Sequence, residues 1–135
     1  MLNADETLVV EFLNSLGPDL DGIRAAIERF TVDDFVYENP GLPPCHGQTE
    51  AIGLYEQFNQ IAGFMRVDIE IRHVRSGAGV VMVERWDSPV TAAGEIIGGE
   101  PGPCLGAFEV RDGRIVAWRD YYDPMPLLNY FRDLS

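Results

Sequence analysis

Apolar residues in the first part of the chain recur at the spacing of an α-helix. The first run, from Leu8 to Leu16, follows the i, i+3, i+4, i+7 pattern and meets Gly17-Pro18, which predicts the end of the helix. A second run, from Leu20 to Phe30, follows Asp19, a residue type that caps helix N-termini. Helical spacing returns from about Gln48 to Met65. The sequence therefore predicts three helices before most of the sheet.

The residues between and after these helices have the pattern of β-strands. Phe35 to Tyr37 favour a short strand, which the proline-rich run from Pro40 to Pro44 ends. Apolar and charged residues alternate from Val67 to His73, as in a strand that packs on one face and meets water on the other. Val80 to Trp86 is predicted to be the next strand, since most of its residues are apolar.

The last two strands carry the strongest local signal in the chain. Leu105 to Val110 and Arg114 to Tyr122 flank Asp112-Gly113, a dipeptide that accepts the positive φ of a tight hairpin turn. The sequence pattern assigns no pairing to the Gly- and Pro-rich segment from Ala92 to Pro103. The apolar residues after Pro124 predict a short C-terminal helix.

The order of these elements indicates the fold class. Helices followed by consecutive antiparallel strands predict an α+β fold, with the helices packed on one face of a curved mixed or antiparallel sheet. A sheet that curls around helices forms a cone, and the interior of the cone is the natural pocket. A length of 135 residues with 46% hydrophobic content fits one globular domain, residues 1–135, around a single core.

Composition excludes several partners. Ten basic residues against 22 acidic ones give a net charge of -12, which repels phosphate backbones, so no nucleic-acid partner is expected. Charges interrupt the apolar stretches well before the roughly 20 residues of a membrane span, and no export signal pattern occurs. We therefore expect no membrane association and a cytoplasmic location. Cys45 and Cys104 lie in Pro/Gly-rich loops and are expected to be free thiols.

Polar or ionisable residues two positions apart recur in three of the strand-like segments. Side chains in a strand alternate between faces, so each pair projects from one side of its sheet. If these sides line one cavity, an arginine lies there between two carboxylates, with a phenol and an amide nearby, and such a set can move protons. The three pairs are Tyr37 with Asn39, Arg85 with Asp87, and Asp120 with Tyr122.

An arginine in such a cavity needs acidic partners, because removing one partner from a buried ion pair costs roughly 3 to 5 kcal/mol. Asp87 and Asp120 are the candidates for Arg85. One negative charge would then be in excess, which favours one acid keeping a proton. The competing interpretation is a surface pair of Arg85 and Asp87 worth under about 1 kcal/mol. Trp118 shares a face with Asp120 and Tyr122 and is expected in the pocket wall or the core.

The motifs of several enzyme classes are missing from the sequence. It contains no G-x-S-x-G elbow, no G-x-G-x-x-G or Walker loop, and no H-E-x-x-H. Neither His46 nor His73 has a second residue at metal-ligand spacing. We therefore expect no metal and no cofactor, and metal-free acid/base chemistry remains.

Three motifs between Tyr37 and Asp123 occur in a distinctive order and separation. They are Tyr37-Glu38-Asn39 before a proline-rich loop and Gly47, Glu84-Arg85-Trp86-Asp87, and Asp112-Gly113-Arg114-Ile115 running into Trp118 to Asp123. On these motifs the sequence resembles, over about residue 6 to residue 131, the limonene-1,2-epoxide hydrolase family, a branch of the cone-shaped nuclear transport factor 2-like (SnoaL-like, cystatin-like) superfold. The resemblance implies a curved mixed sheet wrapped around N-terminal helices.

The same resemblance implies roles for individual residues. Asp120 would act as the general base on a water that Tyr37 and Asn39 hold. Asp87, in its protonated form, would deliver a proton to the oxirane oxygen, while Arg85 would bridge the two acids. A lipophilic epoxide would give a vicinal diol in one step, without a covalent enzyme ester and without a cofactor. The family also implies a homodimer.

Alternatives to this function remain open at the level of sequence. Trp118 and Tyr122 are the candidate substrate-binding residues. In a second enzymatic hypothesis, the chain moves a proton next to a carbonyl, as ketosteroid isomerases of the same superfold do, with Asp120 as base and Tyr37 as oxyanion donor. In a third, the chain is a non-catalytic module for binding a small ligand or for dimerisation, and the fold alone does not choose among the three.

Overall fold

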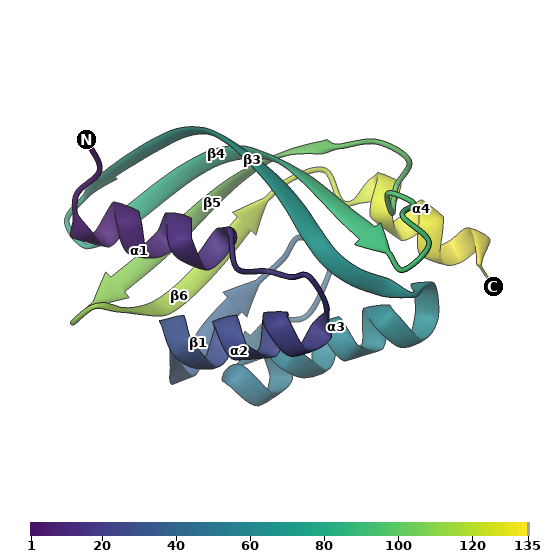
Figure 1. Ribbon diagram of the computed structural model, residues 1–135, viewed down its shortest axis with the longest axis horizontal. Helices are drawn as coiled ribbons and strands as arrows, with labels where there is room; N and C mark the ends of the chain where they lie inside the picture. Colours follow the sequence, from purple (N-terminus) through teal and green to yellow (C-terminus); the bar gives the residue numbers. More distant parts are fainter. Residues whose placement is uncertain (135) are drawn as a thin grey trace.

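The computed structural model describes residues 1–134, in which a curved sheet partly encloses helices (Figure 1). The helices are α1 (Ala4–Leu13), α2 (Leu20–Phe30), α3 (Gln48–Ala62) and α4 (Met125–Asp133). The strands are β1 (Thr31–Glu38), β2 (Cys45–His46), β3 (Phe64–Gly77), β4 (Val80–Thr91), β5 (Gly102–Arg111) and β6 (Arg114–Tyr121). Within residues 1–134, no helix has both the length and the apolar character needed to cross a bilayer.

The strands form one mixed sheet in the order β2-β1-β6-β5-β4-β3. β1 runs parallel to β6, whereas the other neighbouring strands are antiparallel. In Figure 1 the long strands arch over α1, α2 and α3, and α4 lies at one end of the arch. This confirms the predicted α+β class, with a curved mixed sheet and N-terminal helices.

Short polar side chains cap the N-termini of the first two helices. Asn3 and Glu6 form a capping box at α1, in which each side chain accepts a hydrogen bond from the backbone N–H of the other residue, at 2.8 and 3.0 Å. The Asp19 carboxylate accepts from the backbone N–H of Gly22 at 3.0 Å. The predicted cap of α2 is therefore confirmed.

Two predicted helix ends were wrong. α1 ends at Leu13, before the predicted stop at Gly17-Pro18. The apolar pattern continues past the helix because Leu16 is buried in the core without being helical. α3 ends at Ala62 rather than at Met65. Gly63 adopts a left-handed backbone conformation, with φ of 72°, that ends helices and is easiest for glycine.

Several strands are longer than the pattern predicted. β1 begins directly at the end of α2 instead of at Phe35, and β4 continues past Trp86 to Thr91. β5 begins inside the segment from Ala92 to Pro103, for which no pairing was predicted, and the proline loop contributes the short strand β2. Hydrogen bonds to a neighbouring strand extend the strand in each case, and local sequence patterns do not report that pairing.

A tight turn between β5 and β6 and a register shift between β3 and β4 decide which side chains of these strands face inward. Asp112 and Gly113 have φ of 52° and 75°, which confirms the predicted hairpin between β5 and β6. The register of β3 against β4 shifts between Ile71 and His73. His73 therefore turns outward, away from the apolar series it follows in the sequence, and bonds to Glu84 at 2.7 Å.

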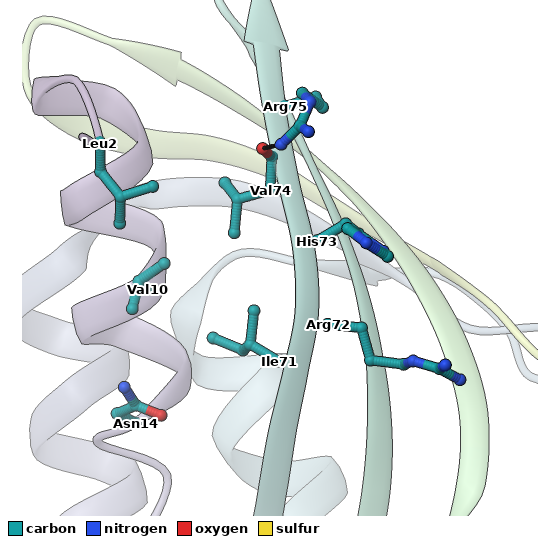
Figure 2. A pocket seen from close by; sticks show the side chains of 8 residues that line it. All are labelled: Leu2, Val10, Asn14, Ile71, Arg72, His73, Val74 and Arg75. Carbon is teal, nitrogen blue, oxygen red and sulfur yellow. Dashed lines mark hydrogen bonds between the residues drawn. The ribbon is translucent and has the colours of Figure 1, made fainter.

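α1 covers the inner side of β3 near the N-terminus of the chain, where a shallow hollow remains between them (Figure 2). Ile71 and Val74 point from β3 toward Val10 of α1, whereas Arg72 and His73 point away from the helix. The hollow therefore has mainly apolar walls and its charged groups face outward.

Candidate active site

A cavity of about 360 Å³ lies between the sheet, α3 and α4. Its walls come from β1, β3, β4, β5, β6 and both helices, so segments from most of the chain meet around it. The structure brings together around this cavity all seven residues that the sequence marked. They are Tyr37, Asn39, Arg85, Asp87, Trp118, Asp120 and Tyr122.

Strand register explains how residues far apart in sequence meet here. Tyr37 of β1 lies opposite Trp118 of the parallel strand β6. Asp120 lies opposite Gly106 of β5, and the side chain of Arg85 reaches it from β4, on the far side of β5. A Cβ atom at Gly106 would lie 2.5 Å from Nη1 of Arg85 and 2.9 Å from Oδ1 of Asp120. The two charged side chains can meet only because a glycine lies between them.

Arg85 is the centre of a buried polar network. Its side chain is only 1% exposed, its Nε donates to Oδ1 of Asp87 at 2.8 Å, and its Nη2 donates to Oδ2 of Asp120 at 2.8 Å. The indole Nε1 of Trp118 donates to the other oxygen of Asp120 at 2.7 Å. Two acids therefore bracket the guanidinium, and the interpretation of Arg85 and Asp87 as a surface pair was wrong.

The surroundings raise the pKa values of Arg85 and Asp87 for different reasons. Burial would by itself lower the pKa of Arg85, but the carboxylates of Asp120 and Asp87 outweigh burial and raise it, so the guanidinium stays charged. Burial also raises the pKa of Asp87, and nearby Asp120 adds to this while Arg85 opposes it. Asp87 therefore keeps its proton to a higher pH than an ordinary aspartic acid does.

Three phenols and one amide lie beside the charged groups. The Tyr122 hydroxyl donates to Oδ1 of Asn39 at 2.9 Å, and the hydroxyls of Tyr37 and Tyr55 lie 2.9 Å apart. The ring of Tyr37 stacks on Trp118 with centroids 4.0 Å apart. Burial raises the pKa of both Tyr37 and Tyr122, so these phenols stay protonated and can donate.

The sequence did not single out three residues of this site, namely Tyr55, Cys104 and Gly106. Tyr55 belongs to the apolar stripe of α3 and could be read as an ordinary core residue; only its hydroxyl was a signal. Cys104 was placed in a loop, whereas it lies in β5 with its thiol at the site, and burial raises the pKa of that thiol. Both Cys104 and Cys45 are free, as expected.

The thiol of Cys104 and the carboxylates of Asp87 and Asp120 lie within 4.8 Å of one another, and these groups are of types that bind metal ions. Both carboxylates, however, already bond to the guanidinium of Arg85. A metal cation would have to lie beside that fixed positive charge. The arrangement fits a proton donor and a proton acceptor better than a cation site.

Apart from these polar groups, the cavity has mostly apolar walls. Aromatic rings and aliphatic side chains surround the space next to the polar network, and two acidic residues, Glu100 and Asp123, complete the lining. Such a cavity favours an uncharged, lipophilic molecule whose reactive part reaches the polar network. The apolar side chains include Phe58, Phe64, Val67, Ile69, Ile97, Leu127 and Phe131.

Comparison with known families and sequences agrees with this geometry. The family model described as the limonene-1,2-epoxide hydrolase catalytic domain matches residues 4–132. The chain is 34% identical to the epoxide hydrolase EphG of Mycobacterium tuberculosis (strain ATCC 25618 / H37Rv) over 116 residues. This alignment covers 85% of this chain and 70% of EphG.

Solved structures share the fold. A limonene-epoxide-hydrolase-like epoxide hydrolase from M. tuberculosis aligns with a TM-score of 0.72 and 25% identity, over 96% of this chain and 90% of that one. A nuclear transport factor 2-like protein of unknown function from Burkholderia pseudomallei K96243 aligns with a TM-score of 0.75 over 96% and 98% of the two chains. At 15% identity, the second likeness shows the fold alone.

Proposed function

Because the chain belongs to the limonene-1,2-epoxide hydrolase family, we propose that it adds water to a lipophilic epoxide in one step and releases a vicinal diol. The observation that supports this best is the bracket of Asp87 and Asp120 around Arg85. One fixed cation between two acids favours a state in which one acid carries a proton and the other does not. Opening an epoxide with water needs such a donor and such an acceptor together.

Asp120 is the general base in this proposal. Its two oxygens each accept one hydrogen bond, from Trp118 and from Arg85, and each keeps a further lone pair for a water molecule. Tyr37 and Asn39 line the same cavity and hold this water. As the water oxygen attacks a ring carbon, its proton passes to Asp120. A positioned base of this kind supplies about a hundred- to ten-thousand-fold in rate.

Asp87 is the general acid. The pKa of its carboxyl group is raised by burial, which favours the protonated form that the role needs. The carbon–oxygen bond of the ring breaks as the new bond to water forms, and the proton of Asp87 passes to the departing oxygen. Arg85 bridges both acids throughout. The proton on Asp120 then returns to Asp87 through the product or solvent, which resets the site.

The size and lining of the cavity limit the substrate. An apolar cavity of about 150 Å³ is large enough to hold benzene, and this cavity is about 360 Å³. An epoxide that carries roughly two benzene-sized apolar groups would therefore fit. The lining beside the network is mostly apolar, and its further acids, Glu100 and Asp123, would repel an anionic substituent.

A single-turnover reaction in oxygen-18 water tests the reaction type. The enzyme, in excess, is mixed with each member of a panel of lipophilic epoxides, and label is followed in the diol and in the protein. We expect label in the diol on the first turnover. Label in the protein contradicts direct attack by water. If no epoxide gives a diol, isomerisation of a β,γ-unsaturated ketone would support the isomerase alternative, and inactivity in both assays would support a binding module.

The substitution Asp120→Asn tests the assigned base. We expect the turnover number to fall by a factor of about a hundred to ten thousand, because the amide cannot take the proton of water. Asp34→Asn, which changes an exposed aspartate in the same way, is the matched control. A cooperative unfolding transition above the assay temperature shows that each variant is folded, and Asp120→Asn should unfold at the lower temperature because its amide does not balance the charge of Arg85. Near-normal rates in Asp120→Asn would show that the role is wrongly assigned.

We propose in addition that the protein forms a homodimer through the outer face of the sheet. Met82, Leu105 and Tyr121 come from β4, β5 and β6 and are 49%, 44% and 58% exposed. Leu105 lies directly opposite Tyr121 of β6, and Met82 lies two residues from Glu84, the β4 neighbour of Leu105, so the three apolar side chains come from adjacent strands around that carboxylate. A second copy that packs face to face would cover them.

A further inference from the structure

Tyr55 lies beside the candidate active site with aromatic rings packed against it. It comes from α3, is 5% exposed and lines the cavity. Its ring stacks between those of Tyr37 and Phe64, with centroids 6.0 and 5.6 Å away, and meets Phe58 edge-on. Packing on both faces prevents the ring from swinging away. The hydroxyl is thereby held 2.9 Å from that of Tyr37.

The contact between the two hydroxyls uses one of their two protons. Within residues 1–134, the Tyr55 hydroxyl has no hydrogen-bond partner other than Tyr37. Either hydroxyl can be the donor, and the proton of the other is then left for a group in the cavity. The ring of Tyr37 stacks on Trp118, whose indole donates to Asp120. Donation from Tyr55 to Tyr37 is therefore the arrangement that leaves a phenol proton on the ring packed beside the charged network.

We propose that Tyr55 is a positioning residue of this site: its hydroxyl donates to the Tyr37 oxygen and leaves the Tyr37 proton to hold the attacking water against Asp120. This inference rests on the proposed hydrolysis of an epoxide. Donation from Tyr37 fixes one lone pair of the water oxygen, while one water proton points to Asp120. The remaining lone pair is then aimed at the ring carbon. Burial raises the pKa of both phenols, so both protons are present over the working pH range.

A double-mutant cycle separates this role from simple packing. Tyr55→Phe keeps the stacked ring and removes only the hydroxyl. We expect the turnover number to fall about tenfold, which is the size of one net hydrogen bond, with KM changed less than about twofold. Tyr37→Phe should cost more, at least about a hundredfold. Because Tyr55 acts through Tyr37, the double variant should be no slower than Tyr37→Phe alone.

The controls make each outcome decisive. Tyr130→Phe removes a phenol outside this cavity and should leave kcat and KM unchanged. Thermal unfolding of every variant shows whether it folds. The inference is overturned if Tyr55→Phe is as fast as the unchanged protein, if it alters mainly KM, or if the losses from the two single substitutions multiply in the double variant. If the unchanged protein makes no diol, the proposed function fails instead.

Discussion

Arg85 and Arg66 form ion pairs of the same type in different surroundings. Each donates from Nε to an aspartate two residues later in its own strand, to Asp87 at 2.8 Å and to Asp68 at 3.0 Å. The side chain of Arg85 is 1% exposed, whereas that of Arg66 is 38% exposed. The sequence spacing is identical in the two pairs, so burial decides what each pair contributes.

The matched substitutions Arg85→Met and Arg66→Met measure that difference. Arg85→Met leaves Asp87 and Asp120 in the protein interior without their cation, and we expect the free energy of unfolding to fall by about 3 to 5 kcal/mol. Arg66→Met should cost less than about 1 kcal/mol, because water screens the exposed pair. Urea denaturation of both variants provides the measurement. Equal losses would mean that the buried network contributes little to stability.

The proton on Asp87 predicts how the rate depends on pH. Because burial raises the pKa of this carboxyl group, it keeps the proton to higher pH than a free aspartic acid. A reaction that needs the protonated form is fast below the raised pKa and slows about tenfold per pH unit above it. The phenol pKa values are also raised by burial, so phenol ionisation lies further toward alkaline pH.

Steady-state rates measured against pH test this assignment. We expect kcat of the unchanged protein to fall on the alkaline side, and the residual activity of Asp87→Asn to lack that fall. An alkaline fall of the same shape in both proteins would mean that another group supplies the proton.

At the level of single residues, the sequence predicted the site where charge and spacing were visible. Arg85, Asp87 and Asp120 stood out because a strand that reads as buried should not carry an unpaired cation. Tyr55 did not stand out, because an aromatic residue in the apolar stripe of a helix is usually a core residue. Its contact with Tyr37 joins a helix to a strand, and such a contact depends on packing that no local pattern contains.

At the level of elements, strand β5 makes the site possible by having no side chain at Gly106. A methyl group there would lie 2.5 Å from Nη1 of Arg85. We expect Gly106→Ala to reduce stability by about 1 to 3 kcal/mol through overpacking, and to lower kcat about a hundredfold by displacing the two charged groups. The control Gly102→Ala lies in the same strand, where an added Cβ meets no atom within 4 Å.

Thermal unfolding and steady-state kinetics on both glycine variants check the prediction. Gly102→Ala should stay within about 0.5 kcal/mol of the unchanged protein. If Gly106→Ala retains full activity, the guanidinium has room to move, and the close fit is not required.

The order and type of the elements could be predicted, but their full length could not. The Asp112-Gly113 turn is local chemistry, so its hairpin was placed correctly. β1 was predicted too short because only Phe35 to Tyr37 show strand preference locally, whereas pairing with β6, far along the chain, begins at Thr31. The end of α3 depended on the backbone conformation of one glycine, Gly63, which composition alone did not fix.

At the scale of the whole molecule, the exposed apolar surface on the sheet predicts an association. We expect sedimentation to give a dimer for the unchanged protein and a monomer for Leu105→Glu, because a second carboxylate beside Glu84 in a covered face is costly. Ile61→Glu is the control, since Ile61 is 50% exposed but lies on α3. A monomer for the unchanged protein, or dissociation of the Ile61→Glu variant, would contradict the proposed interface.

The register shift in β3 lies in an edge strand of the sheet. An outermost strand of 14 residues could recruit strands of other molecules and begin aggregation. The shift after Ile71 interrupts the regular ladder, and the exposed charges of Asp68, Glu70 and Arg72 oppose the approach of a flat neighbour. At the opposite end, β2 offers only two residues. Both edge strands of the sheet are therefore poor templates for the strands of other molecules. The concave face of the sheet, which lines the cavity, stays accessible for the proposed reaction.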